Sequence, residues 1–400
     1  MHLQKFPARL LHNRSATVTR PYGPEERALL SRAGYDAAQA EIGSWPDYRP
    51  TPLVALPGLA RRLGLARLDY KDEGQRFGLE SFKALGGAYA VLRVLQDHLA
   101  SHGVARASAT ELLAGRHRER THDVTVVAAT DGNHGRSVAW GASMFGCQCK
   151  IYLHANVSLD REQAISRYGA RIVRVAGGYD DSVRECAADA QRNGWILVAD
   201  TNAGGGSAEV PKLVMQGYTV MVQEMLDQHT TSPPTHVFVQ GGVGGLAAAI
   251  AGHLWETLGD LRPRIVVIEP DRADCIYRSI EAGQPTAVPH EVDTFMACLA
   301  AGEVSPLAWP ILHYAVDDVV TLPDAAAPAA MRLLAAGFDG DPPLVSGESG
   351  CAAIAGLVAV MLEPDHRKAL GLGPESRVVA IGSEGATDPA TYAKVMAGTT

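Results

Sequence analysis

The sequence predicts an α/β protein of two domains, each built around a parallel or mixed β-sheet. Runs of β-branched and aliphatic residues alternate along the chain with stretches of helical periodicity, which is typical of successive β–α units. At 400 residues, 46% of them hydrophobic, the chain can bury the cores of roughly two or three domains. The turn Ser-Pro-Pro at 232–234 is a candidate crossover. We therefore expect a larger domain from residues 1–94 and 235–400, and a smaller inserted domain from residues 95–234.

The expected strands are short apolar runs bounded by turn residues. They lie at 125–130, 149–154, 171–177 and 195–200 in the smaller domain, and at 236–240, 264–270, 318–322 and 377–383 in the larger one. Helical periodicity predicts helices at 134–146, 159–169, 181–194 and 211–226. Residues 101–123 are polar and basic, and we expect them to form an exposed excursion before the next strand.

Charge, hydropathy and cysteine content argue against several classes of partner. The formal net charge of −8 gives no electrostatic support for binding nucleic acid or an anionic membrane. No apolar run approaches the roughly 20 residues that cross a bilayer, and the N-terminus lacks the apolar core of a secretory signal. Six scattered cysteines are typical of a reduced, cytoplasmic protein. Cys147 and Cys149 have no partner pair nearby, which favours buried thiols over a metal site, while a bridge between Cys275 and Cys298 stays open.

Lys83 is the first candidate for chemistry. It stands in the stretch ESFKALGGAYA (80–90), between the aromatic Phe82 and the pair Gly86 and Gly87. A lysine at the mouth of a helix, with small residues behind it, has room to form an imine with a flat aldehyde cofactor. Taken alone, the segment favours an ordinary solvated lysine. Two other segments reverse that preference.

A glycine-rich turn follows the expected strand at 236–240 and opens a helix of small residues. Its backbone N–H groups and the helix N-terminus suit a bound phosphate. The candidate phosphate ligands are Gly241, Gly242, Val243, Gly244 and Gly245. Residues 242–247 also fit the dinucleotide pattern G-x-G-x-x-A, and Glu269 ends the next strand as a ribose-binding acid would, so this segment alone permits NAD equally well. A turn chosen for close packing is the third interpretation, but four glycines in five residues exceed that need.

The turn TDGNHG (130–135) separates these interpretations. It joins the end of the strand at 125–130 to a helix, and a nicotinamide enzyme has no use for such a turn or for Lys83 in its setting. Asn133 could simply cap the helix or stabilise the turn. We interpret His134 as a packing or capping residue rather than a catalytic base.

Together the three segments resemble the pyridoxal-phosphate enzymes of the threonine dehydratase and tryptophan synthase β-subunit type (fold type II). The resemblance runs from about residue 40 to the end of the chain. It implies pyridoxal 5'-phosphate as the cofactor, Lys83 as the Schiff-base lysine and an active site in the cleft between the two α/β domains. It places the amide of Asn133 against the cofactor's 3-oxygen and the hydroxyl of Ser383 against the pyridine nitrogen. It also implies a homodimer.

Two aspartates resemble one branch, the diaminopropionate ammonia-lyases. Asp131 stands before the glycine of the turn, where related dehydratases carry serine or alanine, and Asp200 precedes the run VPKLVMQGY (210–218). Either could simply cap a turn or a strand end. Elimination from diaminopropionate removes an α-proton and expels a β-amine, and carboxylates near both carbons serve to bind the ammonium and move protons. We assign Asp131 to proton abstraction from the D-isomer, Lys83 to the L-isomer and Asp200 to the departing β-amine.

The predicted function is thus α,β-elimination of D- and L-2,3-diaminopropionate to pyruvate and two molecules of ammonia. The alternative is β-elimination or β-replacement on serine, threonine or a specialised amino acid with the same cofactor. A more distant alternative is an NAD-dependent dehydrogenase built on residues 242–247. The chain departs from the branch at TNAGGGSAEV (201–210), a glycine-rich stretch without the expected aromatic residues, which we expect to form a loop over the substrate.

Overall fold

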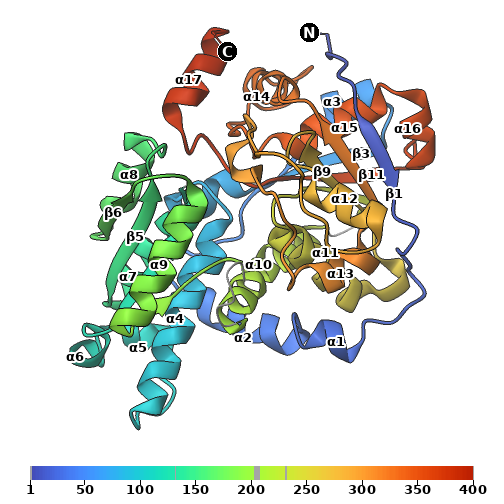
Figure 1. Ribbon diagram of the computed structural model, residues 1–400. Helices are drawn as coiled ribbons and strands as arrows, with labels where there is room; N and C mark the ends of the chain where they lie inside the picture. The colour runs from blue at the N-terminus through green and yellow to red at the C-terminus, as the bar shows by residue number, and fades with distance from the viewer. Residues whose placement is uncertain (1, 131, 202–207, 230–231, 400) are drawn as a thin grey trace. The chain divides into compact units, whose positions relative to one another are not determined.

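The computed structural model describes residues 2–130, 132–201, 208–229 and 232–399 (Figure 1). Contacts within the chain divide it into two compact units. Unit 1 comprises Met1–Ser31, Pro50–Glu80 and Met221–Thr400, and unit 2 comprises Arg32–Arg49 and Ser81–Val220. Each unit has its own β-sheet. The domain boundaries expected from the sequence stay a prediction.

Unit 1 is built on a mixed seven-stranded sheet. Its strands, in sheet order, are β1 (Arg9–His12), β10 (Asp318–Leu322), β9 (Arg264–Pro270), β8 (His236–Gln240), β11 (Arg377–Gly382), β3 (Arg67–Asp72) and β2 (Leu53–Ala55). The five inner strands are parallel, and the edge strands β1 and β2 pair antiparallel to β10 and β3. Strands β8 and β11 are neighbours, with Phe238 opposite Ala380.

Helices cover this sheet and complete the core of unit 1 (Figure 1). They are α1 (Pro24–Arg27), α3 (Pro57–Leu63), α11 (Gly245–Leu258), α12 (Cys275–Ala282), α13 (Trp309–Ala315), α14 (Ala326–Ala336), α15 (Ala352–Met361), α16 (Pro364–Ala369) and α17 (Pro389–Ala397), with 3-10 turns η1 (Glu73–Gly78), η2 (Gly259–Leu261) and η3 (Ala297–Leu299). Every residue of α15 is buried, and this helix packs against β8, β9 and β11. A helix that is apolar all round belongs in a core, which is where α15 lies.

Unit 2 holds a parallel four-stranded sheet in the order β6 (Arg171–Val175), β5 (Gln148–His154), β4 (Thr125–Ala129), β7 (Ile196–Leu197). Its helices are α2 (Arg32–Ile42), α4 (Lys83–Ser101), α5 (Ala109–Leu113), α6 (Arg118–Thr121), α7 (Asn133–Phe145), α8 (Leu159–Ser166) and α9 (Tyr179–Asn193). Helix α10 (Glu209–Gln228) begins in unit 2 and ends in unit 1. Because β7 returns to the far side of β4, right-handed crossovers place α9 on the face opposite α7 and α8.

The predicted α/β class is confirmed, as are seven of the eight expected strands and the four expected helices, with small shifts at their ends. The strand expected at 195–200 is shorter and comprises only Ile196–Leu197. The excursion expected at 101–123 is mostly exposed, and it contains α5 and α6, whose buried Leu112 and Thr121 anchor it. The sequence analysis missed β3, because its Lys71 and Asp72 are polar, yet Lys71 is fully buried with its Nζ 2.9 Å from Glu224 Oε2.

In the part of the chain that the structure describes, no helix combines the length and apolar character needed to cross a membrane. Cys275 is a buried free thiol, and the Sγ of Cys298 lies 3.5 Å from Glu384 Oε2.

Candidate active site

Each sheet has a topological switch point, which is the place where parallel α/β sheets usually bind ligands. In unit 1 the chain passes β8, β9 and β10 in one direction and then returns to β11 on the other side of β8. The carboxyl ends of β8 and β11 therefore flank the switch point. Gly241–Gly245 directly follow β8, and Ser383 directly follows β11. The predicted phosphate turn and the predicted ring-nitrogen partner thus belong to one edge of one sheet.

The turn after β8 has the geometry of an anion cradle. Gly244 is the N-cap of α11 with φ 93°, a conformation that favours glycine, and an added Cβ there would lie 2.6 Å from Leu312 Cδ1. Within the described residues, the backbone N–H groups of Gly242, Val243, Gly244 and Gly245 donate to no oxygen of the chain. Unsatisfied amides at the start of a helix bind phosphate, so these residues fit the phosphate of the cofactor.

Glu269 does not serve as a ribose acid. Its side chain is fully buried, and its two carboxyl oxygens accept hydrogen bonds from the backbone N–H groups of Ile276 (2.9 Å) and Tyr277 (2.8 Å) at the start of α12. Burial raises the pKa of Glu269 to about 8, against the lowering effect of these two bonds. The Glu269 carboxyl group, on which the dinucleotide interpretation depended, is therefore hydrogen-bonded within the protein and is not available to a ribose.

Ser383 is buried beside a second acid that the sequence analysis missed. The Glu384 carboxylate accepts from Ser349 N (3.3 Å) and from Thr387 Oγ1 (3.0 Å). Its backbone oxygen accepts from Gly347 N at 3.2 Å. These bonds tie the residue after Ser383 to the segment before α15 and fix the end of β11. The run Ser-Glu-Gly at the end of a strand could have indicated Glu384, but by itself this run resembles an ordinary turn.

In unit 2 the switch point lies between β4 and β7. The turn after β4 leads into α7, whose first two residues are Asn133 and His134, and the segment after β7 leads to Asp200. The Thr130 hydroxyl accepts from the backbone N–H groups of Gly132 and Gly135, both at 3.1 Å, and so shapes this turn. Asp131 lies outside the described residues.

Lys83 and Asp200, the two predicted catalytic residues that the structure describes, are in contact. Lys83 is the first residue of α4, and its Nζ donates to Asp200 Oδ2 at 2.5 Å. Both side chains are about one-fifth exposed. Burial alone would raise the pKa of Asp200, but the charge of the Lys83 ammonium and its hydrogen bond outweigh burial and hold this pKa well below its usual range. With the Lys83 ammonium beside it, Asp200 is therefore a carboxylate near neutral pH.

Two further side chains face this pair. His134 Nδ1 lies 4.0 Å from Asp200 Oδ2, and its Nε2 lies 2.7 Å from the carbonyl oxygen of Val198. Tyr218 comes from α10, and its ring meets Phe82 edge-on with centroids 4.7 Å apart. Its position depends on Gly86, since an added Cβ there would lie 2.4 Å from Tyr218 Cε1. The sequence analysis missed Tyr218, because an aromatic residue in an amphipathic helix usually indicates core.

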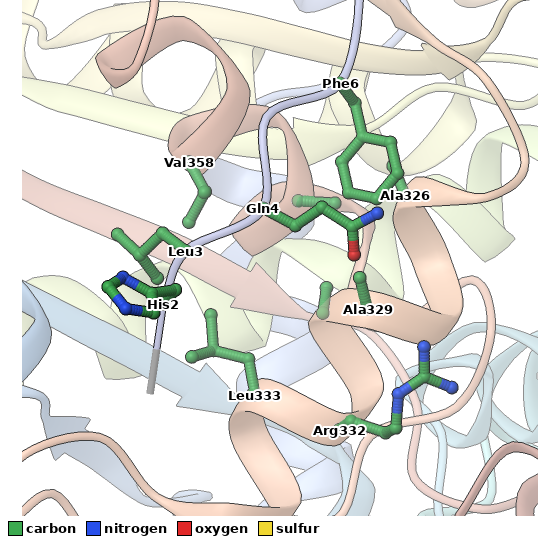
Figure 2. Close-up of a pocket in the computed structure, with 11 residues that line it drawn as sticks. His2, Leu3, Gln4, Phe6, Ala326, Ala329, Arg332, Leu333 and Val358 are labelled. Atoms are coloured by element: carbon green, nitrogen blue, oxygen red, sulfur yellow. The ribbon is translucent and has the colours of Figure 1, made fainter. Parts of the chain in front are cut away.

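A separate cavity of about 270 Å³ lies in unit 1, and none of these residues lines it (Figure 2). It is formed by the N-terminal segment, including Leu3 and Phe6, and by side chains of α14 and α15 such as Leu333 and Val358. Its walls are mostly apolar, and none of the predicted site residues lines it. The cavity is therefore not the catalytic site.

Comparison with known proteins agrees with this geometry. The family described as "Pyridoxal-phosphate dependent enzyme" matches residues 45–384, and the chain belongs to that family of cofactor-dependent enzymes. It is 37% identical over 384 residues to the diaminopropionate ammonia-lyase of Escherichia coli (strain K12), covering 94% of each chain. The resemblance to this branch, inferred from the sequence, is confirmed, and so is the cofactor.

Solved structures of the Escherichia coli diaminopropionate ammonia-lyase have the same fold. One is a complex with an aminoacrylate-PLP azomethine reaction intermediate, with a TM-score of 0.88 at 33% identity. Another is a complex with D-serine, with a TM-score of 0.89 at 33% identity. Each match covers 100% of this chain and 99% of the solved chain.

Proposed function

We propose that the protein eliminates ammonia from D- and L-2,3-diaminopropionate with pyridoxal phosphate, giving pyruvate and two molecules of ammonia. The observation that carries the proposal is the contact between Lys83, the expected Schiff-base lysine, and the carboxylate of Asp200. Such a pair supplies both the group that removes an α-proton and a group that binds a β-ammonium. The activity of the E. coli relative supports the same substrate.

The residues expected to hold the cofactor are among those that the structure describes. The free amides of Gly242–Gly245 would bind its phosphate, with Gly241 at the start of the turn, and Ser383 would meet its ring nitrogen. Asn133, at the start of α7, would bind its 3-oxygen. When bound, the cofactor supplies an electron-withdrawing ring that makes the α-proton of an amino acid acidic. A hydroxyl partner leaves the ring nitrogen largely unprotonated, which favours loss of a β-substituent over transamination.

The protein's own groups then move the protons. Lys83 would take the α-proton of the L-isomer, and Asp131 would take that of the D-isomer from the opposite side. Asp200 would bind the β-ammonium. Release of aminoacrylate into water completes the reaction, since water converts it to pyruvate and the second ammonia.

Serine is the second candidate substrate, because the E. coli relative has been solved in complex with D-serine. Serine presents the same α-carbon but a hydroxyl as the leaving group. The NAD-dependent alternative is set aside, because Glu269 is bound to the start of α12 rather than available to a ribose.

We also propose a cytoplasmic homodimer that acts on a small amino acid. The six cysteines scattered through a large chain are consistent with a reducing compartment. The negative net charge argues against nucleic acid or an anionic membrane as a partner.

The test is a pyruvate assay on cofactor-loaded protein with D- and L-2,3-diaminopropionate, D- and L-serine and L-threonine. Rapid pyruvate formation from both diaminopropionate isomers is the expected result. Pyruvate from serine or threonine alone would mean that the enzyme catalyses a β-elimination on a different substrate. Absence of pyruvate from every substrate would refute elimination as the activity.

A further inference from the structure

Two buried polar atoms beside Lys83 lack hydrogen-bond partners within the described residues. They are Nδ1 of His134 and the hydroxyl of Tyr218. Both side chains are at least 96% buried. Native proteins rarely leave such atoms unsatisfied, and where they do, a ligand often completes the bonding. The two atoms belong to different helices, α7 and α10, yet both face the Lys83–Asp200 pair.

The contact of His134 with Val198 determines what its other nitrogen can do. Nε2 lies 2.7 Å from a carbonyl oxygen, which can only accept, so Nε2 carries the hydrogen and Nδ1 presents a lone pair. That lone pair is 4.0 Å from a carboxylate oxygen of Asp200. Two acceptors cannot hydrogen-bond to each other, so a ligand that binds beside both must supply N–H or O–H donors.

Tyr218 supplies a third acceptor. Its ring is held by the edge-on contact with Phe82 and by the space that Gly86 leaves open. Its hydroxyl is close enough to Lys83 for the ammonium charge to oppose the rise in the Tyr218 pKa that burial causes. In the structure the Lys83 ammonium donates to Asp200, and its charge also acts on His134 and Tyr218.

We propose that His134, Tyr218 and Asp200 form a pocket for the β-ammonium group of the substrate, and that this pocket selects a β-amine over a β-hydroxyl. The inference rests on the proposed function. An alkylammonium has three N–H donors, one for each acceptor, whereas a hydroxyl has one. When Lys83 is bonded to the cofactor, its ammonium no longer satisfies Asp200, and the β-ammonium takes its place.

The chemistry of the leaving group follows from this arrangement. Once the α-proton is removed, its electron pair forms the Cα–Cβ double bond. The Cβ–N bond breaks with its pair on nitrogen, so the ammonium departs as neutral ammonia and needs no added proton. A serine hydroxyl must take up a proton to leave as water. Asp200 and His134 Nδ1 have none to give, and the only proton in the pocket is that of the Tyr218 hydroxyl, whose pKa burial raises. The pocket therefore assists the ammonium more than the hydroxyl.

The first test measures binding rather than turnover. Cofactor-free Lys83→Ala protein vacates the position of the ammonium, and its thermal midpoint is compared in methylammonium and tetramethylammonium chloride at equal concentration. Methylammonium should raise the midpoint more, because a ligand that binds only the folded protein stabilises it and tetramethylammonium has no N–H donor. Wild-type protein, in which Lys83 fills the position, is the control and should respond equally to both salts.

Second-site variants assign the response to the pocket. Adding Asp200→Asn or Tyr218→Phe to Lys83→Ala should abolish or reduce the methylammonium effect. Adding Tyr89→Phe should not, because Tyr89 is a buried tyrosine of α4 whose hydroxyl accepts from Arg93 Nη1 at 2.9 Å. Equal midpoints in the two salts for Lys83→Ala would overturn the proposal.

The second test measures selectivity in the loaded enzyme. Tyr218→Phe should lower kcat/KM for diaminopropionate about tenfold, the usual effect of one hydrogen bond to a charged group, and lower that for serine far less. Equal losses on both substrates would overturn the role in selection. If wild-type protein makes no pyruvate from diaminopropionate while the methylammonium effect persists, the proposed function fails and the ammonium pocket stands.

Discussion

The two switch points of this protein bind in different ways. At the end of β8, the groups available to bind a ligand are the main-chain amides of Gly242–Gly245. The nearby acid Glu269 already accepts hydrogen bonds from the start of α12. At the ends of β4 and β7 the groups on offer are side chains: the Lys83 amine, the Asp200 carboxylate, and the unpartnered atoms of His134 and Tyr218.

The difference corresponds to a division between groups that bind the cofactor and groups that transfer protons. Backbone amides cannot change protonation near neutral pH, so they suit a phosphate that takes no part in the reaction. Side chains that titrate or reorient suit the end where protons move. We call the group of Lys83, Asp200, His134 and Tyr218 the lysine end, and the turn Gly242–Gly245 with Glu269 the glycine end. We therefore expect substitutions at the lysine end to alter turnover and stereochemistry. Substitutions at the glycine end should alter cofactor affinity and its dependence on pH.

The largest effect is expected for Lys83→Ala. Loss of the amine removes both the attachment of the cofactor and a base, so turnover of L-diaminopropionate should fall at least about a thousandfold. The visible absorption of the lysine–cofactor linkage should also disappear. Lys394→Ala, at an exposed position of α17, is the matched control and should retain both. Persistence of the absorption in Lys83→Ala would place the linkage on another lysine.

Asp131→Asn tests whether the D- and L-isomers of the substrate lose their α-protons to different bases. An amide keeps the size of the side chain but cannot accept the α-proton. The rate for D-diaminopropionate should fall about a hundredfold, the usual contribution of a general base, while that for the L-isomer should change little. The ratio of kcat/KM for the two isomers is the measurement, with the L-isomer as the internal control. Equal losses for both isomers would refute separate bases.

Gly244→Ala tests the glycine end. At φ 93° an alanine is strained, and its Cβ would meet Leu312, so the amides of the turn must shift. Cofactor affinity should weaken about tenfold, which corresponds to roughly 1.4 kcal/mol of lost binding. Absorbance titration of cofactor-free protein measures it. Gly373→Ala is the control, because nothing lies within 4 Å of its added Cβ. Similar affinity in both variants would remove the turn from the phosphate site.

The sequence predicted one class of feature well. Strands β8, β9 and β10 match their expected bounds, because β-branched runs between turn residues leave little choice. Lys83, Asp200 and the glycine turn were singled out as candidates because each carries an unusual residue for its setting. All three lie at carboxyl ends of strands or at a helix start, where a local pattern is enough.

What the sequence could not show depends on packing between distant segments. Tyr218 faces Lys83 only because Gly86 opens space between α4 and α10, and no local pattern records that contact. His134 was taken for a packing residue because the bond from Nε2 to Val198, which directs Nδ1 toward Asp200, joins two separate segments. Strand β3 was hidden by Lys71, whose charge is compensated by Glu224 from α10.

The last prediction concerns the pH response of Glu269. Burial raises its pKa in the folded protein to about 8, from a usual value of 4.5. A raised pKa contributes stability that is fully present below the usual value and is lost as pH rises through about 8. Glu269→Gln removes this titration. The denaturation midpoint of wild-type protein should therefore fall relative to that of Glu269→Gln between pH 5 and pH 8.5, whereas Glu375→Gln, at an exposed position, should follow wild type.

The same titration bears on the phosphate. An added Cβ on Gly241 would lie 2.6 Å from Glu269 Cγ, so the acid lies directly behind the phosphate turn. A neutral carboxyl group does not repel a phosphate, whereas an ionised one does. Cofactor affinity of wild-type protein should weaken above pH 8, and Glu269→Gln should weaken less. If both proteins show the same dependence on pH, Glu269 is ionised throughout, and the helix amides alone compensate its charge.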